Sequence, residues 1–163
     1  MSTRWRGFLI ALVLLGGVAS AQSYVGVSAG LPIVLVAGHV GFEDLIAPAV
    51  DLRVNLGGAA LFADGGGIFG VALGADALWR FVGEEARSWT PYAGAGLGIF
   101  AVGAGGGGSV AVEFGGTGGV IGGVDYDFGE LAVFGEIRGE LLWIPAGGFV
   151  GFPGIRLGVK FPW

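Results

Sequence analysis

A single histidine, His39 in the segment VAGHVGF, is the first residue to consider for acid–base chemistry. A hydrolase would need this imidazole beside a serine nucleophile and a carboxylate. Serines beyond the first 21 residues occur only at positions 23, 28, 88 and 109. If the segments around Ser28 and His39 form neighbouring strands, the two side chains share a face. A catalytic pair therefore stays open, although a lone histidine is more often a structural residue.

Charged residues form a more regular pattern, because they recur at alternate positions within apolar segments such as VDLRVNLG, LAVFGEIRGELLW and GIRLGVKFPW. Alternate side chains of a strand share one face, so these charges would gather on one side of a sheet. We expect a paired network from Asp51, Arg53, Asp76, Arg80, Asp125, Asp127, Glu136, Arg138, Glu140, Arg156 and Lys160. Asp125, Glu136, Arg138, Glu140, Arg156 and Lys160 could form one ladder. Such a network could fill a narrow interior or, if its pairs exchange, gate a thin water path.

No motif in the sequence predicts a metal or a cofactor site. Glycine makes up 37 of the 163 residues, so spacings that resemble GxGxxG match by chance. The chain has no cysteine, which excludes disulfides and thiolate ligands. The acidic pairs at 43–44 and 84–85 are expected in solvated turns rather than in calcium sites. We therefore expect no cofactor and no metal.

The elements that must position the charges are β-strands, because large apolar residues also recur with a period of two. The segment 88–112 contains no charge and is long enough for a membrane helix, but it holds Pro91 and eight glycines. Eight strands are expected, at 23–31, 33–42, 47–58, 67–82, 89–103, 110–127, 130–144 and 149–163. The fold class is therefore all-β, and we expect an antiparallel up-and-down barrel.

The kind of barrel depends on whether the apolar residues of each strand face outward or inward. Hydrophobic residues make up 53% of the chain and charged residues only 13%, too few to coat a soluble exterior. A transmembrane barrel places apolar residues toward lipid and polar residues toward the lumen, and its closure satisfies every backbone hydrogen bond. We therefore expect glycine and charge inside. A soluble lipocalin-like barrel that binds an apolar ligand is the alternative, and it requires the opposite orientation.

The N-terminal segment predicts export. Arg4 and Arg6 precede the apolar run FLIALVLLGGV, and small residues stand at Ala19 and Ala21, which is typical of a signal peptide cleaved after residue 21. The predicted domains are thus a signal peptide at 1–21 and a membrane barrel at 22–163. Cleavage leaves six basic residues against 13 acidic ones, a formal charge of −7, which disfavours nucleic-acid binding.

The connections and aromatic residues predict how such a barrel would lie in a membrane. The short polar segments DFGE and GEEAR are expected as periplasmic turns, and AALFADGGG, VGAGGGGS and PAGG as the outward loops. Aromatic residues near strand ends, Tyr24 and Tyr92 among them, are expected in interfacial girdles.

The last strand carries a family resemblance. Its alternate residues are apolar and it closes on an aromatic residue: Ile155, Leu157, Val159, Phe161 and Trp163. This ending resembles the signal that outer-membrane assembly machinery recognises. Together with the signal peptide and eight strands, the chain resembles the small outer-membrane barrels of the OmpA and OmpX type.

The resemblance implies an outer membrane location in a diderm bacterium, contact with outer-membrane lipid and with the assembly machinery, and a monomeric barrel. A structural or minor permeability role, with no enzymatic activity, is expected. Because some barrels of this size modify lipid A, a lipid A-modifying enzyme built on His39 is the alternative within the same family.

Overall fold

The computed structural model describes residues 23–31, 35–63, 66–81, 88–106, 109–145 and 147–163. The predicted signal peptide at 1–21 lies outside the described residues. The described part of the chain forms the following strands: β1 Ser23–Leu31, β2 Leu35–Ala47, β3 Val50–Ala63, β4 Gly66–Arg80, β5 Trp89–Gly106, β6 Ser109–Asp127, β7 Ala132–Ile144 and β8 Gly148–Pro162. None of the described segments is a helix long and apolar enough to cross a membrane.

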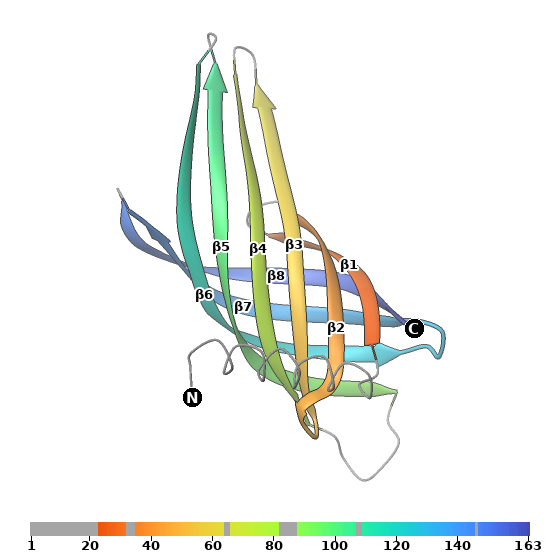
Figure 1. Ribbon diagram of the computed structural model, residues 1–163. Helices are drawn as coiled ribbons and strands as arrows, with labels where there is room; N and C mark the ends of the chain where they lie inside the picture. Colours follow the sequence, from red (N-terminus) through yellow and green to blue (C-terminus); the bar gives the residue numbers. More distant parts are fainter. Residues whose placement is uncertain (1–22, 32–34, 64–65, 82–87, 107–108, 146) are drawn as a thin grey trace, which may run out of the picture.

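The eight strands close into one barrel in which every strand pairs antiparallel with its sequence neighbours (Figure 1). The last strand returns to the first, with Val27 opposite Val159 and Tyr24 opposite Pro162. At this seam the Trp163 N–H donates to the Ser23 carbonyl at 3.0 Å. The start of β1 and the end of β8 therefore lie at the same end of the barrel. The predicted all-β, up-and-down, eight-stranded fold is confirmed.

Strand β2 differs from its predicted bounds of 33–42. It continues to Ala47, with a register shift between Phe42 and Ala47 in its pairing with β3. Asp44 has a left-handed backbone conformation (φ 56°) at this irregularity, and its carboxylate accepts a hydrogen bond from the Ala49 N–H at 2.6 Å. The expectation that Glu43 and Asp44 occupy a solvated turn was wrong, because a bulged strand carries them. The second acidic pair, 84–85, lies outside the described residues.

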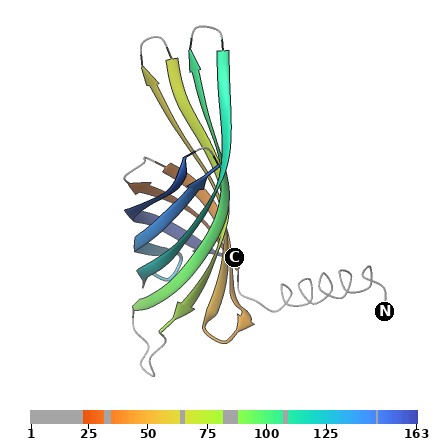
Figure 2. The ribbon, with the colours of Figure 1, turned by 90° about the vertical axis from the view of Figure 1, so that its left-hand side faces the viewer.

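Two of the predicted outward loops are mainly strand. Pairing of β3 with β4 continues to Ala63 opposite Gly66, and pairing of β5 with β6 continues to Gly106 opposite Ser109. These two hairpins rise above the rest of the barrel wall, as Figure 2 shows. AALFADGGG and VGAGGGGS are therefore paired backbone for most of their length. PAGG does connect β7 to β8, and in it the Gly147 N–H donates to the Ile144 carbonyl at 3.0 Å.

The two faces of the barrel wall have the predicted orientation. Large apolar side chains point outward, for example Leu97 at 77% exposed and Ile137 at 70%. Charged side chains at the positions between them point inward and are enclosed, with Arg53 at 0% and Glu136 at 2% exposed. This is the inside-out plan of a membrane barrel and the reverse of what the soluble lipocalin-like alternative requires.

Glycine is common at the inward-facing positions of the strands for a steric reason. A Cβ atom at Gly41 would overlap the Tyr24 ring, and one at Gly123 would lie 2.6 Å from Tyr92 Cζ. Similar overlaps would occur between Gly26 and His39, between Gly96 and Asp76, and between Gly158 and Phe134. Each of these inward side chains thus lies over a glycine of a neighbouring strand, which lets a narrow barrel hold rings and ion pairs.

Candidate functional site: the charged interior of the barrel

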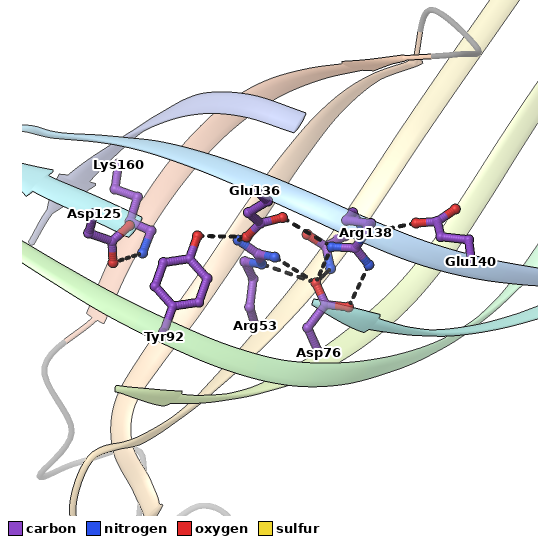
Figure 3. A network of polar contacts seen from close by, with 9 residues as sticks. Arg53, Asp76, Tyr92, Asp125, Glu136, Arg138, Glu140 and Lys160 are labelled. Atoms are coloured by element: carbon purple, nitrogen blue, oxygen red, sulfur yellow. Dashed lines mark hydrogen bonds and ion pairs between the residues drawn. The ribbon is translucent and has the colours of Figure 1, made fainter. Parts of the chain in front are cut away.

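Four charged side chains form a closed cycle across the lumen (Figure 3). Arg53 Nη2 lies 2.8 Å from Asp76 Oδ2, and Arg53 Nη1 lies 2.6 Å from Glu136 Oε1. Arg138 completes the cycle, with Nη2 3.2 Å from Asp76 Oδ1 and Nη1 3.1 Å from Glu136 Oε2. We call these four residues the central cycle. Each carboxylate in it meets two guanidinium groups.

Strand register explains only part of the central cycle. Arg53 on β3 lies directly opposite Asp76 on β4, so that pair follows from the sheet. Glu136 and Arg138 are two positions apart on β7 and therefore share the inner face. Neither β3 nor β4 is hydrogen-bonded to β7. The pair on β3 and β4 contacts the pair on β7 because the barrel is narrow enough for side chains to meet across its interior.

Neutral donors and one further carboxylate complete the surroundings of the central cycle. The Asn55 side-chain amide donates to Asp76 Oδ2 at 2.9 Å, and the Tyr92 hydroxyl donates to Glu136 Oε1 at 2.8 Å. Glu140 accepts from Arg138 Nε at 2.7 Å. Asn55 was not predicted to be part of the network, although it stands in the same alternation as Arg53. Tyr92 was expected in an interfacial girdle, and that was wrong because the residue points inward and is buried.

A second ion pair lies nearer the end of the barrel that carries the termini. Lys160 Nζ is 2.6 Å from Asp125 Oδ2. Aromatic rings surround the ammonium, at 4.8 Å from the Tyr24 centroid, 5.4 Å from Tyr92 and 5.5 Å from Phe134. These distances allow cation–π attraction in addition to the ion pair. Tyr24 is therefore an interior residue and not the girdle residue expected from the sequence.

A third cluster joins β2, β3 and β4 beside the β2–β3 turn. Arg80 lies 3.1 Å from Asp51 Oδ1, 3.2 Å from Glu43 Oε2 and 2.8 Å from Asp44 Oδ1. Asp51 and Arg80 were expected to be inward, and the structure pairs them. Glu43 and Asp44 were missed because the bulge in β2 could not be recognised from the alternation.

Arg156 and Asp127 do not join the network as expected. Among the residues that the structure describes, Arg156 takes part in no ion pair and no side-chain hydrogen bond, although it is only 9% exposed. Glu136 stands opposite it on β7 but contacts Arg53, Arg138 and Tyr92 instead. Asp127 is exposed at the end of β6, where its carboxylate accepts from the Gly129 N–H at 2.6 Å. The single ladder predicted for the last three strands is therefore divided.

His39 and Ser28 are both buried inside the barrel, and the structure shows no hydrogen bond between them. The imidazole packs edge-on against Tyr24 and Phe134, with ring centroids 6.0 Å and 5.4 Å away. No Gly-x-Ser-x-Gly elbow was expected from the sequence, although Ser28 does lie in such a sequence at residues 26–30. That sequence is continuous strand in β1, whereas a nucleophile elbow is a sharp strand-to-helix turn.

The residues of the predicted C-terminal signal lie on the outer face of β8. Ile155, Leu157 and Phe161 are exposed, as is Trp163 just beyond the strand, and Val159 is partly exposed. The four of them that belong to β8 pair in register with the outward residues of β1 across the closing seam. Across the described ranges, no group of three or more histidine and acidic side chains is placed to hold a metal ion.

Comparison with known proteins places this geometry among outer-membrane barrels. No protein-family model and no curated protein matches the chain. The crystal structure of Neisserial surface protein A (NspA) is similar at 16% identity and a TM-score of 0.63, over 86% of this chain and 94% of that chain. The N-terminal β-barrel domain of Pseudomonas aeruginosa OprF is similar at 19% identity and a TM-score of 0.65, over 87% and 97%.

A major outer membrane protein from Thermus thermophilus is similar at 14% identity and a TM-score of 0.57, over 88% of this chain and all of that chain. Identities this low establish the fold alone. The chain therefore has the fold of the small outer-membrane β-barrels, as its sequence predicted.

Proposed function

We propose that the protein is an integral outer-membrane barrel with a structural or minor permeability role, and that its charged interior closes the lumen. The observation that carries this proposal is the central cycle, which joins β3 and β4 to β7 across the interior. The apolar outer wall supports the membrane location. The termini and the β2–β3 turn would face the periplasm, and the long β3–β4 and β5–β6 hairpins would face outward.

Closure follows from the energetics of buried ion pairs. An ion that crosses the lumen must separate charges that are nearly inaccessible to water, and a buried charge left without its partner costs about 3–5 kcal/mol. Both carboxylates of the central cycle touch both guanidinium groups, so no single rearrangement frees a path. The wild-type barrel would therefore show at most rare, small openings.

We expect Arg138→Ala to raise conductance and to weaken the fold. Arg138 contacts Asp76, Glu136 and Glu140, so its loss leaves Asp76 and Glu136 to share Arg53, removes the described partner of Glu140 and opens a gap where the guanidinium lay. Planar-bilayer recordings of refolded protein would measure the change. Arg80→Ala is the matched control, because the described partners of Arg80 all belong to β2 and β3, and these pairs do not bridge the lumen. Silent records and unchanged thermal stability for Arg138→Ala would refute the lumenal role.

We propose that the assembly machinery recognises the C-terminal strand. Phe161→Ala is then expected to lower the amount of folded barrel in outer membranes several-fold while leaving refolding in detergent unchanged. Phe149→Ala is the control, because Phe149 is also an exposed phenylalanine of β8 but lies at its other end. Unboiled and boiled samples compared on a gel would report the folded fraction. Equal losses for the two variants would contradict recognition of the C-terminal segment.

We propose no enzymatic activity for the barrel. A hydrolase needs its serine, histidine and carboxylate within hydrogen-bond reach and open to substrate. His39 is instead enclosed by aromatic rings in the interior, and lipid would contact the outer wall. His39→Ala is expected to leave the lipid A of expressing cells unchanged relative to wild type, as measured by mass spectrometry. Lipid A that is modified by the wild type and unmodified by the variant would restore the enzyme alternative.

A further inference from the structure

A cavity of about 180 Å³ lies above the central cycle, toward the end of the barrel opposite the termini. All eight strands contribute to its lining. Its walls are mostly apolar and include Leu35, Phe100, Leu142 and Phe152. Three charged residues, Arg138, Glu140 and Arg156, complete the lining. The cavity is thus an apolar space with charge at one side.

Arg156 is the charged group of this cavity that lacks a partner. The other described cations, Arg53, Arg80, Arg138 and Lys160, each contact at least one carboxylate. Arg156 contacts none within the described part of the chain, and its buried Nη1 has no hydrogen-bond acceptor. A second space of about 80 Å³, which also borders Asn55 and Asp76, has Arg156 in its lining as well. A buried guanidinium without an anion is costly, so an anionic ligand at this position would offset that cost.

We propose that this cavity binds a small monocarboxylate with an apolar body, its carboxylate on Arg156. A guanidinium binds a carboxylate through two parallel N–H···O bonds, and the apolar walls would enclose the remainder of the ligand. An apolar cavity of about 150 Å³ is known to hold one benzene molecule, so a ring or a chain of about six carbons suits the volume. Such binding requires no passage through the barrel.

The other charges of the lining favour a single negative charge on the ligand. Arg138 is neutralised by Asp76, Glu136 and Glu140 and offers little to a second anion. Glu140 borders the same cavity, so its carboxylate would repel a dianion. Apolar walls leave the far end of a dicarboxylate without a partner. A monocarboxylate should therefore bind better than either a dicarboxylate or a neutral alcohol of the same length.

The test is titration of hexanoate into the refolded barrel in a non-ionic detergent, followed by isothermal titration calorimetry and corrected for empty micelles. We expect saturable binding of hexanoate and of benzoate. 1-Hexanol and adipate should bind at least tenfold more weakly, because a charged hydrogen-bonded pair commonly contributes more than a tenfold change in affinity.

Two variants separate the charge from the cavity. Arg156→Met should weaken hexanoate binding at least tenfold without loss of folding, because it removes an unpaired buried charge and keeps an unbranched side chain. Ala59→Leu should also weaken binding, because the added side chain would occupy the cavity while Arg156 remains. Arg80→Met, whose site does not border the cavity, is the control and should bind hexanoate as the wild type does.

Several results would overturn the proposal. One is the absence of saturable hexanoate or benzoate binding to the wild type, and another is equal binding by the wild type and Arg156→Met. If Arg156→Met does not fold, equal affinities for hexanoate, 1-hexanol and adipate on the wild type would overturn it. Dodecanoate binding that exceeds hexanoate binding and is unaffected by Ala59→Leu would show that acids associate with the outer wall, as lipids do, and not with the cavity.

Discussion

Arg53→Met is expected to lower the free energy of unfolding by about 3–5 kcal/mol, the usual cost of breaking a buried ion pair by removing one partner. Arg53 has 0% of its surface exposed and contacts both Asp76 and Glu136. Without it, both carboxylates depend on Arg138, and water cannot reach them to compensate. Urea unfolding of the detergent-refolded barrel, followed by tryptophan fluorescence, would measure the loss.

The double variant Arg53→Met with Glu136→Gln tests whether the central cycle acts as a unit. It removes one cation and one anion and leaves Asp76 paired with Arg138, so the net charge of the central cycle stays zero. We expect it to cost less than the sum of the two single variants, because directly interacting residues couple by about 0.5–3 kcal/mol. Glu140→Gln is the control: among the described residues Glu140 forms an ion pair with Arg138 alone, its side chain is 23% exposed, and its loss should cost under about 1 kcal/mol. An Arg53→Met variant as stable as Glu140→Gln would contradict the importance of the cycle.

Gly158→Ala is expected to cost about 1–3 kcal/mol, the usual penalty for overpacking. An added Cβ would lie 2.5 Å from two carbons of the Phe134 ring and 2.5 Å from the Val27 carbonyl oxygen. The ring is 1% exposed and the carbonyl belongs to the closing seam, so neither can move freely. The same unfolding experiment would measure the penalty.

The matched control for this substitution is Gly122→Ala. Gly122 is exposed on β6, and a Cβ there would meet no atom within 4 Å. We expect a change within about 0.5 kcal/mol, as for most surface substitutions. If both alanine variants had the same stability, this would contradict the explanation that glycine occurs on the inner face to leave space for inward-pointing rings.

The alternation of residues predicted most of this fold, because a period of two assigns each side chain to one of two faces. Arg53 and Asp76, for example, were correctly placed inside and Leu157 outside before any pairing was known. Strand ends were harder to predict. The segments beyond Gly58 and Gly103, which are rich in glycine and alanine, look like loops, yet they pair as strands because backbone hydrogen bonds need no particular side chain. The bulge in β2 was hidden for a related reason: residues 43–46 of β2 stand against Asp51 alone of β3, and these three extra residues break the alternation on which the prediction rests.

Periodicity in the amino-acid sequence was enough to predict the inside-out wall, the number of strands and most of the charges that face the lumen. The partners of those charges emerge only when the barrel closes. Glu136 stands beside Arg156 in the sheet, yet it binds Arg53 from a strand that is not its neighbour. This contact forms because closure of a narrow barrel brings opposite walls within the reach of long side chains. Local periodicity carries no information about that distance, so neither the central cycle nor the unpaired Arg156 could be predicted from the sequence.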